Sequence, residues 1–298
     1  MLRPLLSLFV ASVLVMGLLA GTAVPPAASP SPSTSTVVAD DHQLVRSSRT
    51  TFGIASFNAL GDSHTRPGGR VAYYASGTTR TGWMITLLNR HRVDVVGLQE
   101  FQPAQHQALR KRAGSTFSIF PGAKRAQRNK QNAIAWRSSK FSLVKGFTVP
   151  ITYMNGRKVP MPVVRLRAKA TGQEFYVITV HNAPGRFPAA ARHRGAALRQ
   201  EVALTKRLLK RGVPVFLTGD MNDREAFFCP YTRQVRMHAA AGGTNRRGCN
   251  PPPGRIARVD WIFGSRDVSF QKYRFVKDSL VRRTTDHPLV VARATIRS

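Results

Sequence analysis

Short runs of alternating or continuous apolar residues dominate the chain after residue 50 and predict strands, whereas helical spacing predicts two helices. The first predicted unit is strand, helix, strand: Thr51–Phe57, a helix carrying Trp83, Leu87, Leu88 and His91, and Val93–Leu98. Further strands are predicted at Ser115–Phe120, Asn132–Trp136, Val163–Ala170, Phe175–Val180, Val213–Thr218, Ile256–Phe263 and Pro288–Ala294. The turn pairs Asn155-Gly156 and Thr171-Gly172 indicate that the middle strands are antiparallel.

The second predicted helix is long and runs from about Ala189 to Lys210, with Gly212 as its cap. Its predicted buried stripe consists of Ala191, Gly195, Leu198, Val202, Thr205 and Leu209. Strands outnumber helices and no repeat of 20–50 residues is visible. The pattern therefore predicts one mixed α/β sandwich over residues 50–298.

The first 49 residues differ in character from the predicted domain. Arg3 is followed by an apolar run from Leu5 to Ala20 and by small residues, which indicates a signal peptide over residues 1–23. Residues 24–49 are rich in Pro, Ser and Thr and are interpreted as a linker. We expect a secreted monomer with no transmembrane segment in the mature form; an uncleaved membrane anchor is the alternative.

The two cysteines, Cys229 and Cys249, enclose a stretch containing Pro and Gly. In an exported chain this favours a disulfide that closes a long surface loop, with two free buried thiols as the alternative.

Charge adds information about partners. The chain has 46 basic and 14 acidic residues, a net charge of +32, and therefore attracts polyanions. Nucleic acid, anionic cell-wall polymers and anionic lipid surfaces all satisfy this requirement, and charge alone does not choose among them.

Polar residues follow or flank the predicted strands at points where a sheet projects side chains into one rim. They are Asn58, Glu100, His181, Asn182, Asp220, Asn222, Asp260, Asp286 and His287. Four of the 14 acidic residues belong to this set, while residues 101–173 contain none. A hard divalent cation is one reason to keep carboxylates there; salt bridges to the abundant arginines are the other.

These polar residues belong to six short motifs that follow one another along the chain: SFN (56–58), LQE (98–100), VHNAP (180–184), GDMN (219–222), VDWIF (259–263) and TDHPLV (285–290). The chain resembles the endonuclease/exonuclease/phosphatase superfamily, which includes pancreatic deoxyribonuclease, abasic-site endonucleases, bacterial sphingomyelinases and inositol-polyphosphate phosphatases. This resemblance implies a four-layer α/β sandwich of two face-to-face mixed sheets flanked by helices.

The resemblance also implies a metal-dependent phosphoesterase. Its catalytic residues would be His181, Asp220, Asn222, Asp260 and His287. The cation would be Mg²⁺, with Mn²⁺ or Ca²⁺ as alternatives, near Asn58, Glu100 and Asp286. In pancreatic deoxyribonuclease a Glu orients the first histidine; here Glu174, a backbone carbonyl or no partner at all could take that place. The other histidines, His64, His91, His106, His193 and His238, receive no predicted role.

The motif VHNAP is closer to the deoxyribonuclease motif than to that of sphingomyelinases, which favours a nucleic acid, and DNA in particular, as substrate. Predicted substrate contacts are Asn182, Lys124, Arg125, Arg128, Arg282 and Arg283. The enzymatic alternative is a phospholipid, sphingomyelin or inositol-phosphate phosphoesterase, for which Phe227-Phe228 would form a membrane-docking tip. A third hypothesis is a polyanion-binding protein without turnover.

Overall fold

The computed structural model describes residues 49–122, 131–185, 188–253 and 259–297, and its architecture consists of two six-stranded sheets packed face to face. The order in the first sheet is β11 (Val268–Val276), β12 (Leu289–Ile296), β1 (Thr50–Asn58), β2 (Val95–Gln99), β4 (Ala133–Arg137), β3 (Phe117–Phe120). The order in the second sheet is β5 (Phe141–Thr152), β6 (Lys158–Ala168), β7 (Glu174–His181), β8 (Val215–Asp220), β10 (Asp260–Ser265), β9 (Met237–Ala239). Both sheets are mixed, because each contains one parallel pair.

The two parallel pairs determine where functional groups gather. Strands β1 and β2 are parallel and are joined through a helix, and the same is true of β7 and β8. All other neighbouring strands are antiparallel, including the predicted middle of the chain. The carboxyl ends of both parallel pairs therefore form one rim, as ligand sites in α/β sheets commonly do.

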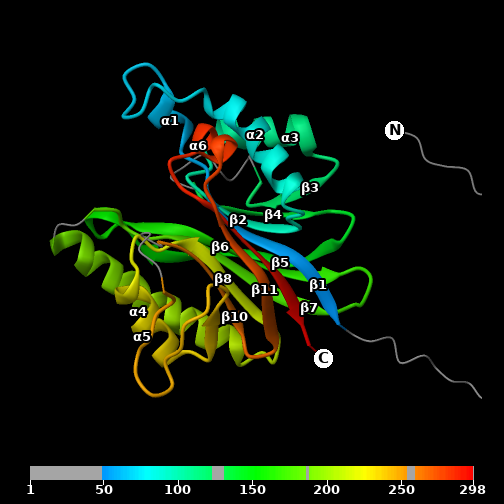
Figure 1. Cartoon of the computed structure of the whole chain (residues 1–298), viewed down its shortest axis with the longest axis vertical. Helices are drawn as coiled ribbons and strands as arrows, with labels where there is room; N and C mark the ends of the chain where they lie inside the picture. The colour runs from blue at the N-terminus through cyan, green and yellow to red at the C-terminus, as the bar shows by residue number, and fades with distance from the viewer. Residues whose placement is uncertain (1–48, 123–130, 186–187, 254–258, 298) are drawn as a thin grey trace, which may run out of the picture. The chain divides into compact units, whose positions relative to one another are not determined.

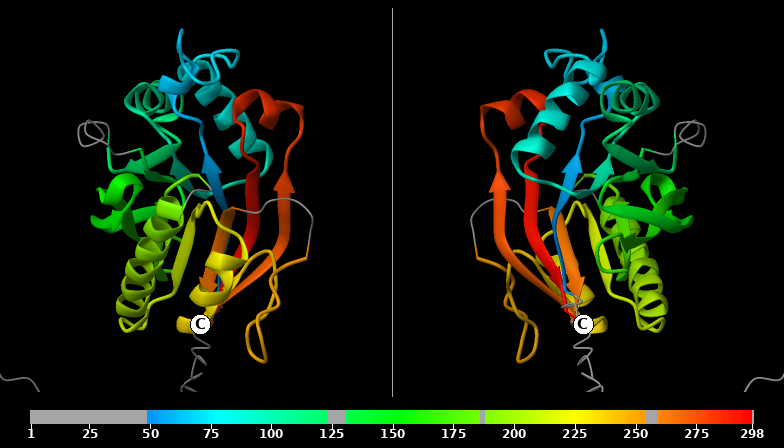
Figure 2. Two further views of the ribbon diagram at one scale, coloured as in Figure 1. Left: turned by 90° about the vertical axis from the view of Figure 1, so that its left-hand side faces the viewer. Right: turned by 90° about the vertical axis from the view of Figure 1, so that its right-hand side faces the viewer.

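Helices cover the outer face of each sheet and complete the four layers (Figure 1). The first sheet is covered by α2 (Gly77–Arg90), α3 (Pro103–Ala113) and α6 (Ser279–Thr284), with the short α1 (Asp62–Thr65) beside them. The second sheet is covered by α4 (Pro188–Leu209) and α5 (Glu225–Gln234). The side views place α4 and α6 on opposite sides of the paired sheets (Figure 2). The predicted four-layer α/β sandwich is thus confirmed.

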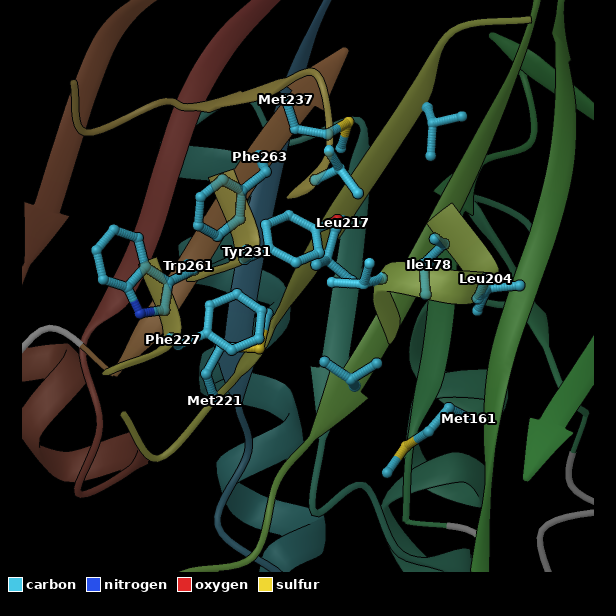
Figure 3. Close-up of a cluster of buried hydrophobic side chains, with 14 of the residues drawn as sticks. Met161, Ile178, Leu204, Leu217, Met221, Phe227, Tyr231, Met237, Trp261 and Phe263 are labelled. Atoms are coloured by element: carbon cyan, nitrogen blue, oxygen red, sulfur yellow. The ribbon is translucent and has the colours of Figure 1, made fainter. Parts of the chain in front are cut away.

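Three apolar clusters hold these layers together. One lies between the sheets and includes the mutually packed rings of Phe52, Phe175 and Phe216. A second joins the first sheet to its helices. The third joins the second sheet to α4 and α5, where aromatic side chains pack on one another (Figure 3). Each buried aromatic side chain stabilises the fold by roughly 1.5–3 kcal/mol.

Phe227 and Phe228 are core residues, as is usual for such a pair, and the alternative of a docking tip does not hold. They are 2% and 1% exposed within the third cluster, because α5 presents both against Trp261 and Phe263. The stripe on α4 is displaced from the predicted one: Ala191 is exposed, whereas the acidic Glu201 is buried beside Val202.

The connection that follows α5 contains the predicted disulfide. Cys229 and Cys249 are bonded, with their Cα atoms 5.6 Å apart. The bond ties the end of α5 to a loop that the sequence fills with Pro and Gly, so it anchors a segment with few apolar contacts.

The segments that were predicted to be a signal peptide and most of the linker lie outside the described residues, and β1 begins at Thr50. No helix within the described ranges is long and apolar enough to span a membrane.

Candidate active site

Polar side chains from four strand ends converge at the rim formed by the two parallel pairs. Asn58 ends β1, Glu100 follows β2, His181 ends β7 and Asp220 ends β8. Two antiparallel strands deliver the rest: Asp260, the first residue of β10, pairs in register with Asp220, and His287 precedes β12, which pairs with β1. The topology thus gathers residues that are up to 229 positions apart, from Asn58 to His287.

Asp220 lies at the centre of this arrangement and is 1% exposed. Its Oδ1 accepts a hydrogen bond from the backbone N–H of Asn222 at 2.9 Å. Its Oδ2 accepts one from Asn58 Nδ2 at 3.1 Å and lies 3.5 Å from His181 Nε2 and 3.7 Å from His287 Nε2. One carboxylate oxygen therefore faces two imidazoles and an amide.

Glu100 is fixed beside Asp220 by the same amide. Asn58 Nδ2 also donates to Glu100 Oε1 at 3.2 Å, and the N–H of Gly61 donates to Glu100 Oε2 at 3.0 Å. Glu100 and Asn222 have φ values of 53° and 49°, in the left-handed region that is unfavourable for residues other than glycine. Strained backbone at two polar residues directly after strands is typical of functional sites.

His64 belongs to the site, although no role was predicted for it. Its Nε2 lies 3.3 Å from Glu100 Oε2. Burial alone would raise the pKa of Glu100, but His64, His181 and the donors from Gly61 and Asn58 hold it well below its usual range. The pKa of His64 is raised, mainly by its hydrogen bond to Glu100. No sequence signal marked His64, since it lies in the short helix α1, outside the six motifs.

His287 and Asp260 form a second hydrogen-bonded pair. His287 Nδ1 lies 2.9 Å from Asp260 Oδ2, so the tautomer is fixed and Nε2 faces Asp220. Burial lowers the pKa of His287, but the carboxylates of Asp260 and Asp220 outweigh it and raise the pKa to about 10. This imidazole is therefore cationic at neutral pH. Both residues were predicted to be catalytic, and the structure places them in direct contact.

The structure shows which carboxylate lies next to the ring of His181. Glu174 is at the opposite end of β7, where it binds Arg165 and Arg167, so it is not the partner. The nearest carboxylate oxygen to the His181 ring is Oδ2 of Asp220, and the ring packs edge-on against Tyr153 at 5.5 Å.

Behind the site, a buried acid on α4 supports the loop after β7. Asn182 accepts from Asn222 Nδ2 at 2.9 Å through its carbonyl, and its own Nδ2 approaches Glu201 Oε2 at 3.5 Å. Burial raises the pKa of Glu201 to about 8, so the side chain is predominantly protonated at neutral pH. Asn182 was predicted to contact substrate; it is fully buried and instead positions Asn222. Glu201 could not be found from an apolar pattern.

The remaining predicted residues have partners outside this set of contacts or lie outside the described residues. The Asp286 carboxylate is 3.6 Å from Arg70 Nη2. On α6, Arg282 donates to the carbonyl of Lys277 and Arg283 lies over the ring of Trp83 at 4.6 Å, so both guanidinium groups have local contacts. Lys124, Arg125 and Arg128 lie outside the described residues.

The donor set fits a hard divalent cation. Among the described residues, Asp220, Asp260 and His287 form a group of possible ligands whose donor atoms lie within 4.8 Å of one another. Asp260 Oδ1 is buried without a hydrogen-bond partner. Glu100 contributes a further carboxylate through the shared amide of Asn58. Clustered carboxylate oxygens are the ligands that Mg²⁺ and Ca²⁺ prefer, and they repel one another without a cation.

A pocket of about 240 Å³ opens beside the centre, with Glu100 and His181 in its wall. The lining also includes an aromatic ring, two cations and a buried amide, from Tyr153, Arg157, Lys158 and Asn132. Asn132 Oδ1 is buried without a partner. Burial raises the pKa of Tyr153, so its phenol remains a hydrogen-bond donor at neutral pH.

The sequence profile of the endonuclease/exonuclease/phosphatase family matches residues 55–287, which include every residue of this centre. The chain belongs to this family. It is accordingly a phosphoesterase, and the resemblance inferred from the six motifs is confirmed. The sequence matches none of the curated proteins with which it was compared.

Solved structures share the fold at low identity. A family protein from Bacteroides thetaiotaomicron superposes with a TM-score of 0.62 and 18% identity, covering 83% of this chain and 96% of that one. The human Nocturnin catalytic domain with bound sulfate superposes with a TM-score of 0.61 and 17% identity, covering 83% of this chain and 97% of that one. D. rerio TDP2 complexed with a single-strand DNA product superposes with a TM-score of 0.61 and 18% identity, covering 82% of this chain and 99% of that one.

Proposed function

We propose that this phosphoesterase is a secreted, Mg²⁺-dependent nuclease that hydrolyses nucleic-acid phosphodiesters, DNA in particular. The observation that carries the substrate assignment is the pocket beside the catalytic centre. It combines the groups that hold one nucleotide unit: a ring for stacking, cations for phosphate and an amide for hydrogen bonds.

Asp220 orients and deprotonates the attacking water. Its Oδ2 is the point on which Asn58, His181 and His287 converge, and its Oδ1 is held by the backbone of Asn222. A carboxylate held on both oxygens accepts a proton along a defined direction, as general base catalysis requires. The side chain of Asn222 donates a hydrogen bond to the backbone carbonyl of Asn182, which fixes the loop after β8 in position.

Two imidazoles complete the proposed displacement. His287, cationic because of Asp260 and Asp220, donates from Nε2 to a non-bridging phosphate oxygen and stabilises the charge that develops there. His181, at the mouth of the pocket, supplies a proton to the leaving oxygen. The proposed acid and base thus lie beside each other at one rim, with the cationic imidazole of His287 next to them.

Glu100 and Asn58 would hold the divalent cation, with the carboxylates of Asp220 and Asp260 nearby. The cation supplies Lewis acidity, which polarises the phosphate and neutralises part of its charge. The strong depression of the Glu100 pKa supports an ionised ligand at neutral pH. His64, on the far oxygen of Glu100, orients this carboxylate.

The pocket favours a nucleotide over a lipid. Tyr153 and Met154 offer stacking and apolar contact, while Arg157 and Lys158 offer charge at the same rim. The amide of Asn132 lines the same pocket and adds a polar group to this lining. The DNA product in the similarly folded TDP2 complex is consistent with this substrate class. The phospholipid alternative also loses its docking tip, since Phe227 and Phe228 are buried.

Export is part of the proposal. The apolar N-terminal run and the bond between Cys229 and Cys249 both suit a protein that matures in an oxidising compartment. Mass spectrometry of culture supernatant is expected to find a mature chain that starts near Val24. Absence of released protein would contradict secretion.

The substrate assignment is tested by comparing kcat/KM for a labelled DNA oligonucleotide, p-nitrophenyl phosphate and sphingomyelin with the purified protein and Mg²⁺. We expect the oligonucleotide to be preferred by at least tenfold, and Tyr153→Ala to reduce this preference. The matched control is Tyr73→Ala, a fully surface-exposed tyrosine outside the pocket. A preference for sphingomyelin or the monoester would overturn the nuclease assignment while leaving the phosphoesterase chemistry intact.

A further inference from the structure

A second, larger hollow lies at the opposite end of the sheets from the catalytic centre. Its volume is about 550 Å³, and its lining includes Gly53, near the start of β1, five residues before Asn58. At roughly 3.3 Å per residue, this places the two sites about 17 Å apart along one strand. The remaining lining comes from the end of α2 and from β11 and β12, namely Arg90, His91, Arg92, Lys272, Arg274, Val291, Ala292 and Arg293.

The lining of this basic hollow contains five Arg or Lys residues and a histidine but no acid. Arg90 is 3.6 Å from Asp278, which is outside the lining. In the described part of the chain, the side chains of Arg92, Lys272, Arg274 and Arg293 have no carboxylate or other hydrogen-bonding partner. Among the described residues, Arg90 is therefore the one cation of the hollow that is paired with a carboxylate, and the charge of the other four is left uncompensated.

Two other pairs of neighbouring cations in the described residues each share a carboxylate. Arg165 and Arg167 both bind Glu174, and Arg137 and Lys140 both bind Asp94. The basic hollow differs from these pairs because its lining contains no carboxylate, and it differs from exposed helix edges because it is concave. Like charges around a concavity are stabilised by an anion that enters it.

The backbone holds two of these cations in place. Arg92 and Lys272 have φ values of 52° and 50°, and β11 changes register between Gln271 and Arg274. Gly53 permits the close approach of the Arg92 carbonyl, because a Cβ at Gly53 would lie 2.1 Å from that oxygen. Both ring nitrogens of His91 are buried without a hydrogen-bond partner at the same place. The cations are thus set on strained, closely packed backbone beside an unsatisfied polar ring.

We propose that the basic hollow is a second anion site, which binds phosphoryl groups of a polyanion away from the catalytic centre. Its volume lies within the roughly 300–1,000 Å³ of pockets that hold ligands of drug size, so it exceeds the needs of one phosphate ion. The shared chemistry is a row of phosphoryl groups, from either a nucleic-acid strand or free oligophosphate. The site binds whether or not the catalytic centre cleaves nucleic acid.

Binding is measured by fluorescence anisotropy with a labelled dT oligonucleotide, and by calorimetry with tripolyphosphate. Glu100→Ala protein is used throughout so that the oligonucleotide stays intact. The test variant combines Arg92→Gln, Arg274→Gln and Arg293→Gln. The matched control removes the same charge from the exposed edge of α4, by Arg192→Gln, Arg199→Gln and Lys206→Gln.

We expect the test variant to weaken binding at least tenfold and the control less than threefold. The slope of log K against log salt should fall by roughly 2 in the test variant, since each lost contact to a single strand contributes about 0.7. Loss with both ligands identifies phosphoryl anions in general, and loss with the oligonucleotide alone identifies a nucleic-acid strand. An equal loss of binding affinity in the test and control variants would contradict the proposal of a second anion site.

Folding is checked by circular dichroism, and Lys272→Gln, an exposed single change, replaces the triple variant if that one misfolds. We then expect this single variant to bind the anion about threefold more weakly, and unchanged binding would contradict the proposal. If the protein cleaves no nucleic acid but the hollow binds as predicted, the proposed function fails and this inference stands.

Discussion

Glu201 makes a quantitative prediction about stability. It is a buried glutamic acid in the middle of α4, 1% exposed, and its hydrogen-bond partner among the described residues is the amide of Asn182 at 3.5 Å. Burial raises its pKa from 4.5 to about 8. Below pH 4 the side chain is protonated in both the folded and unfolded states. Between the two pKa values the unfolded state releases a proton that the folded state retains.

The free energy of unfolding therefore falls as pH rises through this window. Each unit of pKa difference corresponds to about 1.4 kcal/mol, so the wild-type protein loses roughly 4 kcal/mol between pH 5 and pH 8 through Glu201 alone. Glu201→Gln keeps the shape and an acceptor for Asn182 but removes the titration. The variant should gain stability over wild type as pH rises, and the gain should level off above about pH 8.

The assay is urea unfolding of wild type, Glu201→Gln and Glu225→Gln at intervals from pH 5 to pH 9. Glu225 is an exposed glutamic acid on α5 and serves as the matched control, because its substitution removes the same charge without touching a buried carboxyl. His287, with its raised pKa, contributes equally to all three proteins and cancels in the comparison. Parallel stability curves for wild type and Glu201→Gln would refute the reasoning.

Further predictions concern catalysis and packing. Asp260→Asn removes the charge that fixes the catalytic imidazole and should lower kcat by roughly 10²–10⁴ in a steady-state assay with KM little changed. Replacing Cys229 and Cys249 by Ser removes the bond between two residues that are 20 positions apart. The free energy of unfolding, measured in urea, should fall by roughly 3 kcal/mol. Gly97→Ala should lower stability by about 1–3 kcal/mol, since its Cβ would lie 2.0 Å from a hydroxyl of the facing sheet. Gly122→Ala, which meets no atom within 4 Å, is its control.

The architecture could be predicted because the apolar runs are regular and the six motifs are ordered. The strands predicted at Phe175–Val180 and Val213–Thr218 correspond to β7 and β8, and the long helix begins and ends within about one residue of α4. Strand β5 was missed, since Lys145, Gly146 and Pro150 interrupt its apolar pattern and much of it is exposed. Sheet registers such as Asp220 with Asp260 depend on packing, which a local pattern does not encode.

The site was predictable where a motif carried it and not elsewhere. The motif residues Asn58, Asp220 and His287 lie together as expected. His64 approaches Glu100 from the short helix α1, and Tyr153 contacts His181 from the position just after β5, so both depend on tertiary contacts alone. Buried acids such as Glu201 contradict the apolar periodicity that was used to find the core, and only the surrounding packing identifies them.

The central claim is that carboxylates at the strand ends create a cation-dependent phosphodiesterase. The most direct test is nicking of supercoiled plasmid DNA by the purified protein with Mg²⁺, with EDTA, and with the Glu100→Ala and Glu225→Ala variants. We predict nicking by wild type and Glu225→Ala with Mg²⁺, and its loss with EDTA and with Glu100→Ala. Nicking that persists in EDTA or in folded Glu100→Ala protein would contradict the account.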